Sequence, residues 1–172
     1  MQKGKMKTES EFYKKLLSYD QKVLSSFLRK MNKMSWKKLS KNMEASHYSI
    51  AEIFVHVLGV YNGWLNYNLY GKWDEIPTKT LNMENYHSTK DIQKFMDAVW
   101  DGVSKLAKNL DDELLDKKVR APWMPGNHSL RDVLMQVSLE QAHHIGEIIC
   151  LMWQLDVEPP EMTWIMNTRN LK

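Results

Sequence analysis

The sequence is poor in cysteine and lacks any long uncharged apolar run. Its single thiol, Cys150, cannot form an internal disulfide framework. No stretch approaches the roughly 18 apolar residues of a membrane-spanning helix, and no apolar run follows the first lysines, as a secretory signal requires. We therefore expect a cytoplasmic protein without a membrane partner. Because Cys150 lies among Ile148, Ile149 and Leu151, we expect its thiol to be buried and unreactive.

A large excess of one charge is also missing. The formal net charge is only +3, and the basic residues are dispersed. Two small basic runs, residues 3–7 and 37–41, have no interleaved aromatic residues, so we interpret them as solvated faces rather than a nucleic-acid surface. With 43% apolar and 26% charged residues, the 172-residue chain has the composition of a globular domain. We assign residues 1–172 to a single domain, in which the polar residues 1–7 are expected to be disordered.

Apolar residues that recur every three or four positions predict four amphipathic helices. Each begins after a Ser or Thr that stands three residues before an acidic residue, which is the pattern of a capping box. The predicted helices cover about residues 9–33, 50–70, 89–110 and 130–155. We expect Gly71 to end the second helix in a left-handed conformation. The fourth helix is apolar on nearly every side, so we expect it to be the most buried.

These helices predict an all-α fold, an antiparallel four-helix bundle with long connecting loops. No segment shows the alternation of a strand, and a short last turn is expected at residues 161–166. The connections at residues 35–48, 72–87 and 111–128 are long, and loops of this length are often functional. We expect Trp73 and Trp123, which lie in two of them, to wall a pocket. Four-helix bundles hold metal and cofactor sites between facing helices.

A candidate metal site follows from the spacing of Glu140 and His144. Residues four apart lie on one face of a helix, so this carboxylate and this imidazole point the same way. Glu140 is the one acidic residue in an apolar row, and a buried charge without a partner is costly. A divalent cation would compensate it, with His56 of the second helix as the third ligand. Three such ligands suit zinc, iron or nickel and leave a coordination position open, as in catalytic sites.

The residues also allow a simpler interpretation. Glu-x-x-x-His is a weak motif, so Glu140 and His144 can equally be an ordinary helix pair, with His56 a histidine of the core. His143 is an alternative ligand. Glu147 stands three residues after His144 and is expected to orient an imidazole by accepting its N–H. The remaining histidines are expected to be exposed polar residues: His47, His87 and His128.

Several segments together resemble a known family, the DinB/YfiT-like superfamily, over about residues 8–166. The segments are SIAEIFVHVL at 49–58, SLRDVLMQV at 129–137, HHIGEI at 143–148 and LDVEPPE at 155–161. The resemblance implies a four-helix bundle with a metal triad, in which one histidine comes from the second helix and a His-x-x-x-His pair from the fourth. These positions correspond to His56, Glu140 and His144, so at Glu140 a carboxylate replaces the family's histidine.

The resemblance also implies a function. Related members include S-transferases and isomerases that use a low-molecular-weight thiol, and amide or ester hydrolases, and many form homodimers. We therefore expect an enzyme that uses a divalent metal, zinc, nickel or iron, to activate a thiol or water for transfer to, or hydrolysis of, a small substrate. The alternative is a non-catalytic, stress-related dimeric bundle in which Glu140 and the histidines are structural. Nucleic-acid binding rests on a pI of about 8.8 alone, and we do not expect it.

Overall fold

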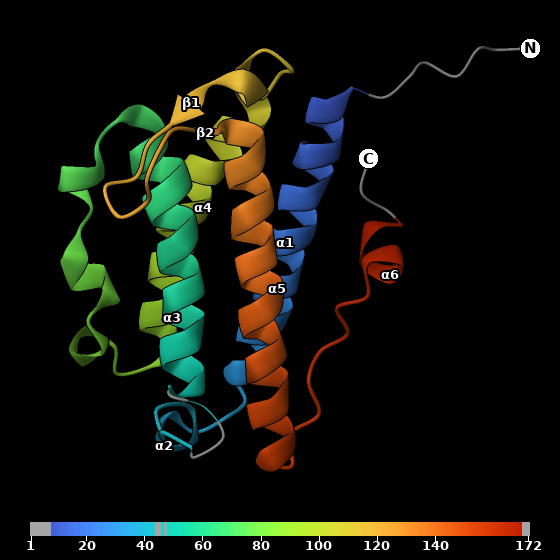
Figure 1. The fold of residues 1–172 in the computed structure, drawn as a ribbon. Coiled ribbons are helices and arrows are strands. Elements are labelled where there is room, and N and C mark those ends of the chain that lie inside the picture. Colours follow the sequence, from blue (N-terminus) through green and yellow to red (C-terminus); the bar gives the residue numbers. More distant parts are fainter. Residues whose placement is uncertain (1–7, 44–45, 47, 170–172) are drawn as a thin grey trace, which may run out of the picture.

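Four long helices form the frame of the molecule in the computed structural model, which describes residues 8–43, 46 and 48–169 (Figure 1). The helices are α1 (Glu9–Met31), α3 (Ile50–Tyr61), α4 (Thr89–Asn109) and α5 (Leu130–Gln154). Each of the four predicted helices therefore has a counterpart, and the protein is mostly helical, as an all-α fold requires. The disorder expected of residues 1–7, and the exposure expected of His47, lie outside the described residues.

Side-chain caps begin three of the four long helices where the sequence predicts them. The Thr8 hydroxyl accepts a hydrogen bond from the backbone N–H of Glu11 in the first turn of α1. Before α3, Ser49 accepts from the backbone of Glu52, and the Glu52 carboxylate accepts the Ser49 N–H at 2.7 Å. Ser129 forms the same reciprocal pair with the acidic residue three positions later, before α5. Ser88 accepts no such bond before α4. These caps satisfy amides that a helix start leaves without a partner.

The four helices pack in a ring around one apolar core. Both α3 and α1 contact α4 and α5. Figure 1 shows that α1 and α5 run in one direction and that α3 and α4 run in the other. The contacting pairs α3–α5 and α1–α4 are therefore antiparallel, whereas α3–α4 and α1–α5 run parallel, so the expectation of an antiparallel bundle is wrong for two of these four contacts. The cause is the long segment 62–88, which leaves one end of α3 and returns along the outside before α4 begins.

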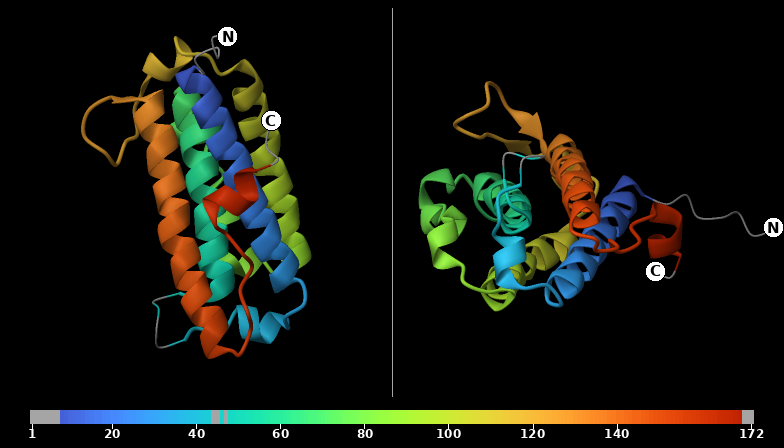
Figure 2. Two further views of the ribbon diagram at one scale, coloured as in Figure 1. Left: turned by 90° about the vertical axis from the view of Figure 1, so that its right-hand side faces the viewer. Right: turned by 90° about the horizontal axis from the view of Figure 1, so that it is seen from below.

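The connections contain short elements that the sequence pattern does not reveal. They are a one-turn helix, α2 (Trp36–Leu39), three 3₁₀ turns between Trp73 and Asn85, a fourth at Leu114–Asp116, and two strands, β1 (Lys118–Val119) and β2 (His128–Ser129). The strands pair antiparallel, with Lys118 opposite Ser129. Strands of two residues are too short to show alternation, so the expectation of no strand is wrong in this detail. Near the expected last turn, α6 (Trp164–Thr168) lies across α1 (Figure 2).

Two expectations about burial are wrong. In α3, 8 of 12 residues are buried, against 10 of 25 in α5, so the second long helix and not the last is the most buried. Cys150 is exposed, because the buried face of α5 passes through Ile148 and Leu151 and position 150 turns away from it.

Within the described part of the chain, no helix is long and apolar enough to span a bilayer.

The second long helix changes its winding before it ends. After Tyr61 the chain continues as π-helical turns over Asn62–Tyr67 and a 3₁₀ turn over Asn68–Tyr70, and Gly71 ends it with φ of 71°, as predicted. Within the π-helical part, the Asn66 amide donates to the Val99 carbonyl of α4 at 3.0 Å. It also donates to the Asn62 side chain at 3.1 Å. A Cβ on Gly102 would overlap the Asn66 side chain, so the glycine makes room for this link between helices.

A methyl group at position 102 should therefore weaken the fold. We expect Gly102→Ala to lower the free energy of unfolding by about 1–3 kcal/mol, because Asn66 must leave its two acceptors or α4 must shift. Gly146→Ala in α5 is the matched control, since its Cβ meets nothing within 4 Å. It should stabilise by up to about 1 kcal/mol through helix propensity. Urea unfolding measures both, and a Gly102→Ala protein as stable as wild type would contradict the proposed crowding.

One carboxylate is buried at the centre of the helix ring. Asp20 of α1 is only 1% exposed, and its Oδ2 accepts from the Tyr61 hydroxyl of α3 at 2.8 Å and from the Ser138 hydroxyl of α5 at 2.6 Å. The Gln141 amide lies 3.3 Å from the Asp20 carbonyl oxygen. Burial raises the pKa of Asp20 to about 6, and the two hydroxyl donors only partly oppose this. The group thus ties three helices together at an electrostatic cost near neutral pH.

This raised pKa predicts a specific pH dependence of stability. Well below pH 4 Asp20 is protonated in both states. As the pH rises past 4 the unfolded chain ionises first, so the folded state loses stability, by up to about 3 kcal/mol above pH 6. Asp20→Asn keeps an acceptor for both hydroxyls but does not titrate. We expect the difference in unfolding free energy between wild type and Asp20→Asn to change in the variant's favour between pH 4 and 6. A parallel pair of curves would contradict this, and the exposed Asp97→Asn serves as the control.

Candidate metal centre between α3 and α5

Two of the predicted ligands meet where α3 packs on α5. His56 lies in the middle of α3 and His144 in the middle of α5. Their ring centroids are 4.7 Å apart, with an angle of 80° between the planes. His56 is exposed at the edge of the core, whereas the His144 side chain is 17% exposed. The helix contact therefore brings together two imidazoles that are 88 positions apart in the sequence.

Glu140 approaches the same point from one turn earlier in α5. Its Oε2 lies 3.5 Å from Nε2 of His144, and its Oε1 accepts from the Gln136 amide at 3.3 Å. The carboxylate is 35% exposed, so the expectation that it is buried in the core is wrong. The physical reason is that the row through Val137 and Ile148 faces the core, while Glu140 stands at its margin beside a cavity.

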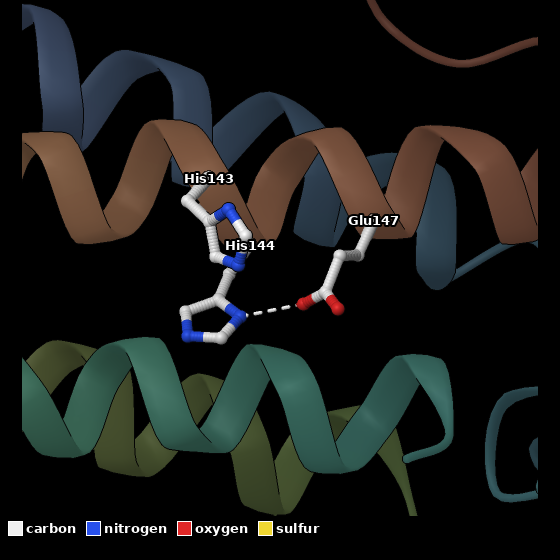
Figure 3. A group of neighbouring side chains, drawn as sticks. All are labelled: His143, His144 and Glu147. Carbon is white, nitrogen blue, oxygen red and sulfur yellow. Dashed lines mark hydrogen bonds and ion pairs between the residues drawn. The ribbon is translucent and has the colours of Figure 1, made fainter. Parts of the chain in front are cut away.

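Glu147 forms a hydrogen bond with the other ring nitrogen of His144. Its Oε2 lies 2.6 Å from Nδ1, and Figure 3 shows the His144 ring extended from α5 toward α3 with this contact beside it. An ionised carboxylate only accepts hydrogen bonds, so the proton is on Nδ1. In the neutral ring, Nε2 then presents a lone pair to the Glu140 carboxylate. Two acceptors that face each other repel unless a cation or a proton lies between them.

One pair of the predicted donors has the spacing of two ligands on a divalent metal. In a tetrahedral site with bonds of about 2.1 Å, two ligand atoms are about 3.4 Å apart, and the separation of His144 Nε2 from Glu140 Oε2 is 3.5 Å. Burial lowers the pKa of His56, and the nearby charge of His144 lowers it further, although Glu140 and Glu147 oppose both effects. A lowered pKa favours the neutral imidazole, which is the form that binds metals.

The ligand atoms of His56, Glu140 and His144 do not all lie within 4.8 Å of one another, and the group among the described residues that does so lies on α5 alone. One ligand atom each from His143, His144 and Glu147 lie within 4.8 Å of one another (Figure 3). The contact of 2.6 Å between His144 and Glu147 is shorter than the spacing of two ligands on one ion and suits a hydrogen bond. His143 is exposed, and its ring centroid lies 4.9 Å from that of His144. This geometry favours Glu147 as an orienting group.

Two cavities adjoin the predicted triad. One of 240 Å³ is lined by His56, His144 and residues of the segments on either side, including Tyr48 and Met83. The other, of 630 Å³, is lined by His56, Glu140 and three tryptophans: Trp64, Trp73 and Trp123. The two loop tryptophans thus line a cavity, as expected. The sequence analysis missed Trp64, because a tryptophan in an apolar helix pattern gives no signal of a cavity wall.

The other histidines lie apart from this point. His87 is exposed, as expected. His128 of β2 is partly buried, contrary to expectation, and its Nε2 is buried with no hydrogen-bond partner among the described residues. Its ring centroid lies 6.4 Å from that of Trp64. The β-hairpin, which the sequence did not predict, carries this side chain inward.

Comparison with known proteins decides the family. A family model described as the DinB superfamily matches residues 21–148 of the chain. The chain belongs to the DinB superfamily. A crystal structure of a DinB-like protein from Bacillus cereus ATCC 10987 superposes with a TM-score of 0.64 at 19% identity, covering 88% of this chain and 95% of that one. This likeness concerns the fold. No curated protein matched the sequence.

Membership of the DinB superfamily gives the geometry its context, since metal binding is common in the family. The matched residues include both histidines of the predicted triad and Glu140. The resemblance noted in the sequence implies a histidine where this DinB-like chain has Glu140. A carboxylate at that position still reaches the neighbourhood of His144, although it brings a negative charge in place of a neutral ring.

The contact between His144 and Glu147 predicts one tautomer of the ring. In chelator-treated protein above pH 7.5, long-range ¹H–¹⁵N spectra should show the His144 proton on Nδ1 and a bare Nε2. In Glu147→Ala the Nε2–H form should gain population, because the acceptor is gone. The exposed Glu158→Ala should leave the His144 signals unchanged. Protonation of Nε2 in the wild-type protein would contradict the assignment.

Proposed function

We propose that the protein is a metal-dependent enzyme of the four-helix-bundle type. In this proposal His56, Glu140 and His144 bind one divalent ion between α3 and α5. The observation that carries the proposal is the separation of 3.5 Å between His144 Nε2 and Glu140 Oε2, with the His56 ring beside them. Two acceptors in that position need a cation or a proton between them, and in a DinB-superfamily chain we assign a metal cation to this place.

The remaining features support a catalytic rather than a structural ion. Three protein ligands leave a position open, and the triad adjoins cavities of 240 and 630 Å³ that a small substrate can enter. A bound ion would lower the pKa of a coordinated thiol or water and so would supply a nucleophile for a small electrophilic substrate at neutral pH. Glu147 keeps the His144 proton on Nδ1 so that Nε2 is free to bind. Three tryptophans give the larger cavity an apolar lining for such a substrate.

The ligand types restrict the choice of ion. Two imidazoles and a carboxylate suit zinc, nickel and iron. They disfavour magnesium and calcium, which prefer oxygen ligands. The net charge of the ligand set is −1, compared with zero for three histidines. The site should therefore bind a divalent cation more readily than a triad of neutral imidazoles does at the same geometry, provided that Glu140 is ionised.

Metal content of purified protein tests the proposal. Protein prepared without chelators should contain about one divalent ion per chain, and His56→Ala, Glu140→Gln and His144→Ala should each lose most of it. Glu147→Gln should weaken binding by about tenfold to a hundredfold, because it only orients a ligand. His143→Ala and His87→Ala are the controls and should retain the ion.

The outcomes separate the two groups of ligands. Loss of metal in His143→Ala with full retention in His56→Ala would move the ion to His143, His144 and Glu147 and overturn the triad. Equal and negligible metal in every protein would remove the enzyme proposal. Circular dichroism of each variant checks that the helices are intact.

A second candidate function, a non-catalytic homodimer, rests on a surface of α5. The residues Met135, Leu139, Ala142, Gly146, Ile149 and Trp153 recur at alternating intervals of four and three positions along that helix. Leu139 is 58% exposed and Trp153 is 56% exposed, which is unusual for apolar side chains of this size. Large residues at both ends and small ones in the middle allow two copies to pair antiparallel about a twofold axis.

The oligomeric state tests this second candidate. In sedimentation equilibrium, the wild-type protein should form dimers, and Leu139→Glu should be monomeric, because it places a charge in the paired surface. The control, Phe12→Glu, removes an exposed apolar residue of α1 outside that surface and should remain dimeric. A monomeric wild-type protein at micromolar concentration would reject the dimer without affecting the metal proposal.

A further inference from the structure

A third cavity lies on the side of the molecule formed by the turn after the π-helical segment and by β1. Its volume is 510 Å³, and β1 contacts the turn Asn68–Tyr70 that forms its other wall. Its lining includes one amide, two aromatic rings and three cations: Asn68, Tyr70, Trp73, Lys117, Lys118 and Arg120. Neither His144 nor Glu140 is part of its lining, so the cavity is separate from the predicted metal centre.

The lining carries three positive charges and no negative one. Lys117, Lys118 and Arg120 all face this cavity, and none of the described lining residues has a carboxyl group. None of the three forms an ion pair in the described part of the chain, where the ion pairs involve other cations. The charge of Lys118 contributes to lowering the pKa of Asp132, but that carboxylate already accepts a hydrogen bond from the Ser129 N–H. Three cations on one cavity repel each other unless an anion joins them.

A buried amide lacks hydrogen bonds at the same place. Asn68 is 2% exposed, and both its Nδ2 and its Oδ1 are buried without a partner among the described residues. An unpaired buried amide costs stability, and such groups are rare in folded proteins. The cost is explained if the Nδ2 group donates to a ligand that enters the cavity. The buried amide of Asn68 thus distinguishes this cavity from a cluster of surface cations alone.

Two aromatic rings give the cavity an apolar side. Tyr70 is 53% exposed and Trp73 is 51% exposed, and the Lys117 ammonium lies 5.4 Å from the centroid of the Tyr70 ring. Exposed rings of this size beside cations are suited to stack on a planar group. Trp73 also lines the cavity of 630 Å³ that contains His56, so one ring is common to both cavities.

We propose that this cavity binds a small aromatic molecule through an anionic group, a phosphate ester or a carboxylate. Lys118 and Arg120 neutralise the anion, Asn68 donates a hydrogen bond to it, and Tyr70 and Trp73 contact the ring. Phosphate and carboxylate oxygens are the acceptors that lysine and arginine bind most strongly. The site does not require the metal ion, and it goes beyond the function proposed above.

Calorimetric titration with phenyl phosphate tests the charges. At low ionic strength, where surface charges are little screened, wild-type protein should bind phenyl phosphate more tightly than inorganic phosphate and phenol. Removing both cations in Lys118→Gln/Arg120→Gln should weaken binding by at least tenfold, since each is a charged hydrogen-bond donor. The matched control is Lys108→Gln, an exposed lysine on α4 outside the cavity, which should bind as the wild type does. Phenylacetate in place of phenyl phosphate identifies which anion the site prefers.

The variant Asn68→Leu separates a binding role from a structural one. Leucine has a similar shape and no polar atoms, so it should raise the melting temperature and weaken the binding of phenyl phosphate several-fold. A structural role for the amide would instead lower the melting temperature and leave binding unchanged. Only the first combination supports the proposal.

Three results would overturn the inference. They are no measurable binding of phenyl phosphate at millimolar concentration, equal binding by the double variant and the wild type, and equal affinity for inorganic phosphate and phenyl phosphate, which would remove the aromatic part. His144→Ala should bind phenyl phosphate as the wild type does. Failure of the metal proposal and failure of this one are therefore distinguishable.

Discussion

The packing of α3 against α5 is the contact on which the rest of the structure depends. Helix axes in such pairs lie about 8–10 Å apart, so imidazoles on facing sides can meet in the space between them. His56 and His144 do so at 4.7 Å between ring centroids. The contact is held by apolar residues such as Phe54 and Ile148, which are fully buried. The polar groups therefore occupy the margin of a core whose geometry is fixed by apolar packing.

A second polar centre lies deeper in the same ring of helices. Asp20 joins α1 to Tyr61 of α3 and Ser138 of α5, the same two helices that carry the candidate ligands. Its bonds fix the register of these helices, because moving either by one turn would leave a buried carboxylate without donors. The two centres thus have different roles. The Asp20 centre holds the helices in register, and this register places the side chains of the candidate metal centre at the edge of a cavity.

The sequence predicted the parts of this structure that depend on local chemistry. Caps such as Ser49 and Ser129, and the left-handed Gly71, set helix ends through bonds or dihedral angles within a few residues. The spacing of Glu140 and His144 follows from helix geometry, and the family resemblance indicated His56. The antiparallel arrangement was wrong for α3 and α4, because helix direction depends on how far a connection travels and not on the residues within the helix.

Other misses have the same kind of cause. Cys150 lies within an apolar run, but helical phase turns it away from the core. Glu140 was expected in the core and lies at its margin, because the width of the buried face depends on how closely a neighbour packs. The buried Asn68 and the three cations at Lys117, Lys118 and Arg120 come from separate parts of the chain. No periodic pattern relates them, so only the folded arrangement places them together.

The crossover at residues 62–88 has a consequence for how such proteins can diversify. It spans the outside of the helix ring because α3 and α4 run in the same direction, and its residues line both the cavity beside His56 and the one beside Lys118. The helices that carry His56, Glu140 and His144 are tightly packed and tolerate little change. Insertions or replacements in the crossover leave that packing intact while they reshape what enters from solvent. Selection can thus alter the shape of both cavities in this segment independently of the candidate metal centre.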